Sequence, residues 1–396
     1  MIANNFLSSL GKEKKIIKNS LFIFSSSLVS AILSTTSNLI FSRFFGPVGF
    51  GIFKTAFSLA STGAYSLDFG LRYLLTRYIA EFEGKKQPEN ITHLIKRSLL
   101  FKVIVAIFAL LFLFLFRQQI AQIFFHDENL SFLILPIAVL FTIIFFDITS
   151  PVLLGYQNFK LLALISILVP LFNILFGLPM AFVWGLEGIL FGSCLAFITG
   201  NIPAIKFILQ KIQKKSKFRS FSFKTSFVTY SIPAYFAYVP SYVTIVIIPL
   251  LSLFFSQRQV GFYSLSFSFY TAAQLIPVTL SNVMFPKVAK LHSQKKSITA
   301  FQTFKRLIII YTPLAILGSF LIIPLTQPII GLLVPSFLPA VRIIIIQTIA
   351  AFFLGYFSIT VNYAIATGKL KIATILNWTL SILFLILAFS VTGLVQ

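Results

Sequence analysis

Eleven apolar runs divide this chain, and each is near the ~20 residues that an α-helix needs to cross a bilayer. They lie at about 16–41, 52–73, 98–116, 130–156, 161–183, 188–209, 226–255, 261–285, 307–326, 338–363 and 372–394. Lipid offers the backbone no hydrogen-bonding partner, so such runs form spanning helices. Prolines inside several runs predict kinks or interruptions. The pattern predicts an all-α integral membrane protein of about eleven transmembrane helices.

The composition supports this class. Hydrophobic residues make up 58% of the chain and charged residues only 10%, whereas a soluble domain carries about 25% charged residues. In a soluble protein a net charge of +23 would suggest nucleic-acid binding. Here lysine and arginine gather in alternate loops, as expected for cytoplasmic loops that face anionic lipid. We therefore expect membrane lipids, and no nucleic acid, as partners.

The charge alternation also orients the chain. One set of loops is rich in lysine and arginine, and the other set contains only Arg43, Arg117, Arg258 and Arg342. The N-terminal segment carries Lys12, Lys14, Lys15 and Lys18 before an apolar stretch from about Leu21 to Phe41. This run is too long for the core of a signal peptide, and no A-x-A cleavage site follows it. We expect an uncleaved first span with a cytoplasmic N-terminus.

Landmarks recur at a nearly constant offset. Gly261 follows Gly51 by 210 residues, Lys371 follows Lys160 by 211, and Gly393 follows Gly185 by 208. An even number of spans separates the copies, which predicts two parallel repeats. We expect an N-terminal six-helix lobe at 1–209, a basic cytoplasmic linker at 210–225 and a C-terminal lobe of about five helices at 226–396. The chain ends where the repeat predicts a twelfth helix.

No motif predicts an enzyme. The chain has neither a P-loop nor an H-E-x-x-H motif, and its three histidines are far apart in sequence. Cys194 is the only cysteine and lies in an apolar run, where core packing explains it. We predict no catalytic residues, no metal site and no cofactor.

Charged residues at membrane depth are the informative ones, because each costs roughly 2.5–3.5 kcal/mol at a helix centre. Lys102 and Asp147 fall at similar predicted depths in consecutive spans, which predicts an ion pair that fixes helix packing. The alternative is a proton- or cation-responsive carboxylate at Asp147. Asp68 is expected to form an ion-pair cluster with Arg72 and Arg77, with a gate that breaks on opening as the second interpretation.

A further set of polar residues has a binding and a structural interpretation. Lys54 either contacts an anionic substrate group or extends to the membrane interface. Arg43 and Arg258 lie in related breaks of the two halves, near a substrate or at lipid phosphates. Asn38, Gln274 and Gln347 either hydrogen-bond sugar hydroxyls or join helices. The same two interpretations hold for Asn282 and Asn362.

The stretch from Asn38 to Ala80 adds a resemblance to a known family. It contains RxxGPxGFGxF from Arg43 to Phe53, DFGL from Asp68 and RYIAE from Arg77. This pattern resembles the opening of the polysaccharide-export flippases, including O-antigen flippases, of the multidrug/oligosaccharidyl-lipid/polysaccharide exporter superfamily. These commonly have at least twelve helices, so the early end of this chain departs from the family.

The resemblance implies a function. It implies two helical lobes around a central cavity that opens alternately to either side of a bacterial inner membrane. The implied substrate is a polyprenyl-pyrophosphate-linked oligosaccharide, held by cations such as Lys54, Arg43 and Arg258. Ion coupling would involve Asp147, with Lys102 and Asp68 as further candidates. A polysaccharide polymerase or another assembly protein is the implied partner.

Three alternatives stay open at this point. A lipid II flippase fits the same scaffold, although the first hairpin reads GPVGFGIF and lacks the acidic pattern associated with that group. A multidrug exporter of the superfamily would favour an acidic cavity, yet the chain has only nine acidic residues. A non-transporting scaffold of a polysaccharide assembly complex is the third alternative.

Overall fold

The computed structural model describes residues 2–212 and 221–394, and within these ranges the chain forms helices and turns without a strand. The α-helices are α1 (Ile2–Ser66), α2 (Leu71–Gly84), α3 (Pro88–Leu115), α4 (Arg117–Phe125), α5 (Ile134–Phe146), α6 (Thr149–Gly155), α7 (Phe159–Lys211), α8 (Phe223–Ser226), α9 (Ile232–Tyr238), α10 (Val243–Ser252), α11 (Gln257–Ser293), α12 (Ser297–Leu333), α13 (Val341–Ala366) and α14 (Leu370–Gly393). Short 3₁₀ or π turns occupy Glu128–Leu133, Phe227–Ser231, Val239–Tyr242 and Pro335–Ala340.

Two of these helices are bent and account for two predicted runs each. In α1 the backbone leaves helical geometry at Gly46, with φ 65° and ψ −178°. Glycine adopts such a φ at little cost, and Pro47 fits the first turn of the helix that follows. In α7 the break lies at Trp184 and Gly185, where Gly185 has φ 55°. Both breaks fall between apolar runs, as the sequence predicted.

Helices occupy all eleven predicted runs within the described residues. Seven of the described helices are long and apolar enough to cross a membrane, and a bent pair brings the number to eight. That pair, Phe223–Tyr238 with Val243–Ser252, bends by 60° around the segment that contains Pro240. The interruption expected from the prolines of run 226–255 is therefore present.

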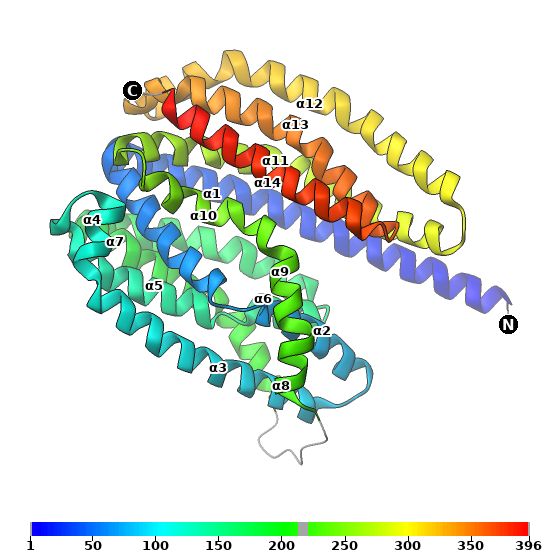
Figure 1. The fold of residues 1–396 in the computed structure, drawn as a ribbon. Coiled ribbons are helices and arrows are strands. Elements are labelled where there is room, and N and C mark those ends of the chain that lie inside the picture. Colours follow the sequence, from blue (N-terminus) through cyan, green and yellow to red (C-terminus); the bar gives the residue numbers. More distant parts are fainter. Residues whose placement is uncertain (1, 213–220, 395–396) are drawn as a thin grey trace. The chain divides into compact units, whose positions relative to one another are not determined.

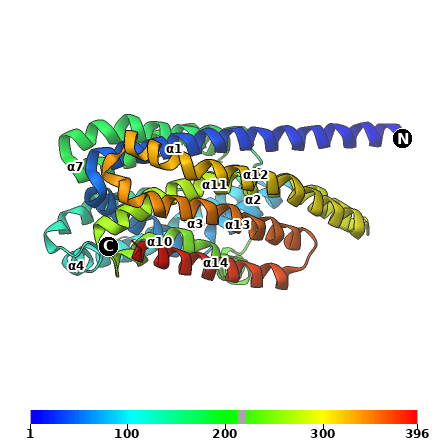
Figure 2. The same cartoon turned by 90° about the horizontal axis from the view of Figure 1, so that it is seen from above.

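The chain forms two compact units. The first unit comprises the described residues up to Leu39 and from Leu265 onward, and the second comprises those from Ile40 to Ser264. In the first unit α13 packs against both α12 and α14, and these helices lie along one another in Figure 1 and Figure 2. In the second unit α5 packs against both α3 and α7, and α2 packs against α6.

The predicted linker at 210–225 lies only partly within the described residues. Residues 213–220 fall outside them, so the structure describes α7 up to Lys211 and the chain again before α8. The division into lobes at 1–209 and 226–396 stays a prediction. The two compact units are composed differently, since the beginning of α1 belongs with the C-terminal helices.

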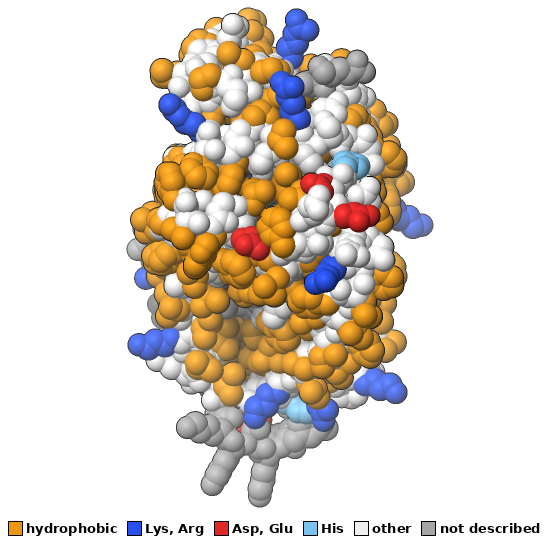
Figure 3. Space-filling model, turned by 90° about the vertical axis from the view of Figure 1, so that its left-hand side faces the viewer, with side chains coloured by type: hydrophobic (Ala, Val, Ile, Leu, Met, Phe, Trp, Pro, Cys, Tyr) orange, Lys and Arg blue, Asp and Glu red, His pale blue; other side chains and the backbone are white. Residues whose placement is uncertain are grey.

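The surface has the character of a membrane protein. Hydrophobic side chains cover most of the face shown in Figure 3, and lysine and arginine side chains are scattered over it. Helix α3 exposes a run of large apolar side chains that includes Ile107, Phe108 and Leu115. Helix α12 does the same with Phe320 and Leu332. Such apolar surfaces are suited to lipid, because the core of a bilayer contains no water that could hydrogen-bond to polar groups.

Candidate functional site

Two glycines allow a close helix crossing in the second unit. A Cβ atom placed on Gly51 would overlap the backbone carbonyl of Gln257 and lie 3.0 Å from the amide nitrogen of Gly261. A Cβ atom placed on Gly261 would overlap the carbonyl of Pro47 and lie 3.2 Å from the amide nitrogen of Gly51. Only glycine therefore fits at either position without moving the backbones apart.

This crossing, from Pro47 to Gly51 and from Gln257 to Gly261, joins the two copies of the repeat. Each glycine approaches the carbonyl four residues before the other glycine, so the contact is reciprocal. We name it the glycine end of the second unit. The two segments that the sequence matched as copies of a repeat thus contact each other here through a reciprocal pair of backbone contacts.

Side chains add two hydrogen bonds at the glycine end. The hydroxyl of Thr55 donates to Oε1 of Gln257 at 3.2 Å, and Nε2 of Gln257 donates to the Phe124 carbonyl at 2.6 Å.

Lys54 follows the glycine end directly and lies among phenylalanine rings. Its Nζ is 5.4 Å from the ring centroids of Phe50 and Phe53 and 6.0 Å from that of Phe57. These distances are within the range in which a cation is attracted to an aromatic face. The helix thus holds an ammonium group on an aromatic face of α1, and the substrate contact expected for Lys54 stays a prediction.

Arg43 and Arg258 do not occupy equivalent positions of the repeat. The reciprocal contact pairs Pro47 with Gln257, which places the counterpart of Arg258 at Val48. Both arginines are exposed, and the guanidinium of Arg258 lies 5.6 Å from the ring centroid of Phe262. Their predicted role in substrate binding stays a prediction.

A buried ion pair lies at the other end of the same helical stretch. Nζ of Lys102, on α3, is 2.8 Å from Oδ1 of Asp68, and the two side chains are only 4% and 6% exposed. The same ammonium donates to the Phe145 carbonyl at 2.5 Å, and the backbone amide of Arg72 donates to Oδ2 of Asp68 at 3.0 Å. Each charge thus has a charged partner and a second hydrogen bond, which is what burial requires.

This pair corrects two predictions. The ion pair predicted between Lys102 and Asp147 is wrong, because Lys102 takes Asp68 as its partner. Asp68 was expected to form an ion-pair cluster with Arg72 and Arg77; the described contacts give it Lys102 as its ion-pair partner and the backbone amide of Arg72 as a donor. The guanidinium of Arg72 still interacts electrostatically with Asp68 and lies 4.4 Å from the Tyr65 ring centroid, and that of Arg77 lies 4.2 Å from the Tyr230 ring centroid. The sequence placed Asp68 and Lys102 in different candidate pairs because the pairing was judged from depth along the spans, which does not say which helix faces pack together.

Asp147 lies where α5 ends and forms a small polar cluster with Thr149 and Asn201. Its Oδ1 accepts from the Thr149 amide at 2.9 Å and lies 2.5 Å from the Thr149 hydroxyl. The same hydroxyl is 2.8 Å from Oδ1 of Asn201 on α7, and Nδ2 of Asn201 donates to the Phe197 carbonyl at 2.8 Å. We call these three residues the Asp147 cluster. Thr149 and Asn201 are buried, with 4% and 8% of their surface exposed.

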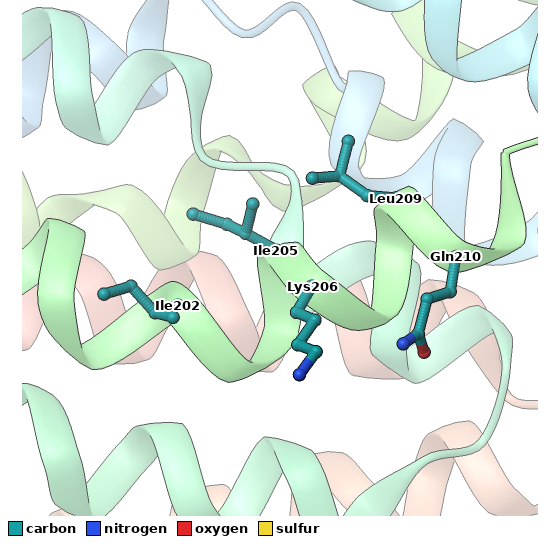
Figure 4. A pocket seen from close by; sticks show the side chains of 5 residues that line it. All are labelled: Ile202, Ile205, Lys206, Leu209 and Gln210. Carbon is teal, nitrogen blue, oxygen red and sulfur yellow. The ribbon is translucent and has the colours of Figure 1, made fainter.

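The cluster borders a cavity of about 360 Å³. The remaining described residues that line it are apolar and include Ile95 and Leu99 of α3 and Ile205 of α7. A neighbouring hollow of about 490 Å³ lies along α7. In Figure 4, Lys206 and Gln210 extend from one side of this helix while Ile205 and Leu209 extend from another. Since Ile205 and Leu209 also line the cavity of the Asp147 cluster, they separate Lys206 from that cavity.

The three predicted amides join helices within the first unit. Nδ2 of Asn38 donates to Oγ of Ser268 at 2.9 Å. Oε1 of Gln347 accepts from Oγ of Ser266 at 2.7 Å, and Nε2 of Gln274 donates to the Ala351 carbonyl at 2.8 Å. These contacts favour the structural interpretation of the amides, although a role in sugar binding was also predicted.

Sequence reasoning missed Thr149, Asn201 and Gln257. Thr149 carried a local signal, because a threonine two residues after an aspartate commonly closes a turn through its amide and hydroxyl. Asn201 and Gln257 carried none, since their partners are distant in the sequence. Among the described residues no group of three or more histidine, cysteine, aspartate or glutamate side chains converges on a metal-sized site.

Known proteins resemble this chain in sequence. A sequence profile of the family described as "Polysaccharide biosynthesis protein" matches residues 16–292. Stage V sporulation protein B of Bacillus subtilis (strain 168) is 26% identical over 220 residues, which are 52% of this chain and 41% of that protein. The match thus spans about two fifths of the length of this curated relative.

Two solved structures share the fold. The lipid II flippase MurJ in an inward closed conformation aligns with a TM-score of 0.71 at 16% identity, over 94% of this chain and 85% of MurJ. A mutant form of the Vibrio cholerae MATE transporter VcmN aligns with a TM-score of 0.65 at 16% identity, over 97% of each chain. At such identities the likeness concerns the fold, which is that of multi-pass, all-α membrane transporters.

Proposed function

Because the chain belongs to the polysaccharide biosynthesis protein family, we propose that it flips a polyprenyl-pyrophosphate-linked oligosaccharide across the inner membrane of a bacterium by alternating access. The oligosaccharide is an O-antigen unit or another polysaccharide repeat unit. Transport runs from the inner to the outer leaflet, with the N-terminus in the cytoplasm. The chain then acts as a transporter and not as an enzyme.

Lys54 is the observation on which we base the substrate class. It directly follows the signature stretch from Arg43 to Phe53, and its ammonium lies over phenylalanine rings. A pyrophosphate carries negative charge that a lysine ammonium binds as a point charge. The adjacent rings suit the first apolar units of the polyprenyl tail. In this proposal Arg43 and Arg258 are further cations that contact the anionic headgroup.

A lipid II flippase is the second candidate, because MurJ shares the fold over most of both chains. Lipid II has the same polyprenyl-pyrophosphate anchor and differs in the sugar and peptide that it carries. The chemistry at Lys54 would therefore be the same, and only the glycan distinguishes the two candidates. A multidrug exporter has less support, since the carboxylates of Asp68 and Asp147 are already bonded to Lys102 and Thr149.

The test is the translocation of a fluorescent polyprenyl-pyrophosphoryl oligosaccharide in proteoliposomes that contain the full chain. Wild-type protein is expected to flip the lipid faster than protein-free vesicles. Lys54→Ala should lower the initial rate about tenfold or more, in line with the loss of a charge-assisted contact of about 1.5–3 kcal/mol. Lys54→Arg should retain part of the rate because the charge is kept.

Lys206→Ala is the matched control, because Lys206 lies beside a hollow on α7 away from the glycine end. It should flip at the wild-type rate. Flipping of lipid II but not of the oligosaccharide would select the second candidate. Folded wild-type protein that flips neither lipid would contradict the proposed function and favour a structural role in an assembly complex.

A further inference from the structure

An apolar cavity of about 630 Å³ lies in the second unit, bordered by the end of α1, the turn that follows it, and helices α3, α4 and α5. We call it the α3 cavity. The described residues that line it carry hydrocarbon side chains or, at Gly63, no side chain. Such a lining offers water no side-chain hydrogen bond, and an apolar cavity of about 150 Å³ is already large enough to bind benzene. The α3 cavity therefore suits a hydrocarbon ligand.

The α3 side of this cavity also faces the outside of the protein. Phe108 and Phe112 line the cavity, and each is more than half exposed. They lie one helical turn apart, on the helix whose exposed apolar side chains are suited to lipid. The cavity is thus continuous with a lipid-facing surface, so its ligand comes from the bilayer.

An aromatic ring lies at one end of the cavity. Phe69 lines the cavity directly after Asp68, whose carboxylate is paired with Lys102. The φ of Phe69 is 46°, which is uncommon for a residue other than glycine, and the Ser231 hydroxyl donates to its carbonyl at 2.9 Å. Its ring centroid is 6.1 Å from that of Phe101 on α3. The buried ion pair and this held turn therefore bound the cavity on one side.

From that end the cavity extends over the depth of about one leaflet. Its lining on α3 runs from Val105 to Leu113, a length of about 12 Å at helical rise. The hydrocarbon core of a bilayer is about 30 Å thick, so a single leaflet accounts for about 15 Å. A fatty-acyl chain has this reach, whereas a polyprenyl tail is much longer. The length of the cavity thus favours an acyl chain.

A cation lies beyond the other end of the cavity. Ile120 and Phe124 of α4 line it, and Arg117 is the first residue of that helix. Residues at i, i+3 and i+7 share one face of a helix, so Arg117 lies on the face of α4 that borders the cavity, one turn before Ile120. Arg117 is exposed, and a guanidinium matches the geometry of a phosphate. An apolar slot with an arginine at its interfacial end is complementary to a phospholipid.

We propose that the α3 cavity binds one acyl chain of a membrane phospholipid, whose phosphate contacts Arg117. The lipid comes from the leaflet on the side of α4, opposite the predicted cytoplasmic side of the N-terminus. Its chain fills the space between α1, α3 and α5 and stabilises their packing. Lys54 is not among the described residues that line the cavity, so this lipid site is separate from the proposed substrate contact and does not depend on it.

Native mass spectrometry of the full chain tests the site without any transport assay. Delipidated protein in detergent is titrated with palmitoyl-oleoyl phosphatidylglycerol, and the fraction that carries one lipid is measured. Ala109→Phe places a ring in the cavity and should weaken binding about tenfold or more, because the acyl chain loses buried methylene groups. Arg117→Gln should weaken binding about fivefold, because one cation near the lipid phosphate is lost.

Each variant has a matched control. Leu111→Phe also adds a ring on α3, but Leu111 is exposed and is not among the described residues that line the cavity. Arg342→Gln also removes an exposed arginine, but Arg342 lies at the start of α13 in the first unit. Both controls should bind phosphatidylglycerol as the wild type does.

Thermal unfolding in detergent separates a filled cavity from a misfolded protein. Phosphatidylglycerol should raise the unfolding temperature of the wild type and of Leu111→Phe, because a ligand of the folded state stabilises it. It should not raise that of Ala109→Phe, which should still unfold cooperatively.

Wild-type affinity in Ala109→Phe or in Arg117→Gln, or a wild type that retains no lipid, would overturn the proposal. Displacement of the phospholipid by an equimolar amount of polyprenyl phosphate would assign the cavity to the substrate tail instead, also against the proposal. A protein that binds the phospholipid as predicted and flips no lipid-linked oligosaccharide would refute only the proposed function.

Discussion

The two ends of one helical stretch in the second unit are held together in different ways. At the glycine end, Gly51 and Gly261 bring two backbones into direct contact without any charge. Asp68 lies 17 residues after Gly51, a separation of about 25 Å at helical rise. In that region the buried ion pair of Asp68 and Lys102, together with hydrogen bonds to the Phe145 carbonyl and the Arg72 amide, joins α3, α5 and the start of α2. We call this region, with the Asp147 cluster, the carboxylate end.

The difference separates a contact made by backbone shape from contacts made by charge and hydrogen bonds. A backbone contact between glycines depends on shape alone, so pH and ligands leave it unchanged. The carboxylate end combines the buried ion pair of Asp68 and Lys102 with the hydrogen bonds of the Asp147 cluster. The contact at the glycine end therefore depends on backbone shape, and the contacts at the carboxylate end depend on charge and hydrogen bonding.

The largest effect on stability is expected for Lys102→Met. It leaves the carboxylate of Asp68 buried without its cation, and removing one partner of a buried pair costs about 3–5 kcal/mol. Asp68→Asn combined with Lys102→Met should lose less, because no lone charge is left. Thermal unfolding in detergent measures both.

Lys85→Met is the control for this comparison. The ion pair between Lys85 and Glu81 is exposed, at 56% and 36% of the side-chain surface, and exposed pairs contribute about 0–1 kcal/mol. Its unfolding temperature should match that of the wild type. Equal losses in Lys102→Met and Lys85→Met would show that the ion pair of Asp68 is not the buried contact described above.

A smaller loss is expected at the glycine end. Gly261→Ala places a methyl group against the Pro47 carbonyl, and overpacking of this kind costs about 1–3 kcal/mol. Gly331→Ala is the matched control on α12, because its methyl group would have only one neighbour within 4 Å, Leu338 at 3.7 Å. That variant should be as stable as the wild type, since alanine favours a helix. If Gly261→Ala were equally stable, the close crossing would be excluded.

The smallest loss is expected for Asp147→Asn. The amide oxygen of asparagine can accept from the Thr149 amide and hydroxyl as Oδ1 of Asp147 does, so these hydrogen bonds are kept. A hydrogen bond is worth about 0.5–1.5 kcal/mol net, and here it is replaced rather than removed. We expect a change in the free energy of unfolding below about 1 kcal/mol. A loss as large as that of Lys102→Met would instead assign Asp147 a purely structural role.

The sequence predicted the helices well and the polar contacts poorly, for physical reasons. Length and apolarity fix where a helix can span, and Gly46 and Gly185 are visible as breaks. Gly51 and Gly261, which the sequence matched as landmarks of a repeat, lie at the close helix crossing. The partner of Lys102 depends on which helices pack together, and depth along the spans did not decide between Asp68 and Asp147. Asn201 could not be predicted because its partner lies 52 residues away.

The ion-coupling role predicted for Asp147 is tested by measuring the initial rate at which the fluorescent lipid-linked oligosaccharide is flipped, with and without an imposed pH gradient. Wild-type protein and Asp147→Asn are compared in the same assay. We predict that the gradient changes the initial rate of the wild type several-fold. Asp147→Asn, folded and inserted to the same extent, should flip at one rate with or without the gradient. A variant that responds to the gradient as the wild type does would contradict the coupling role of Asp147.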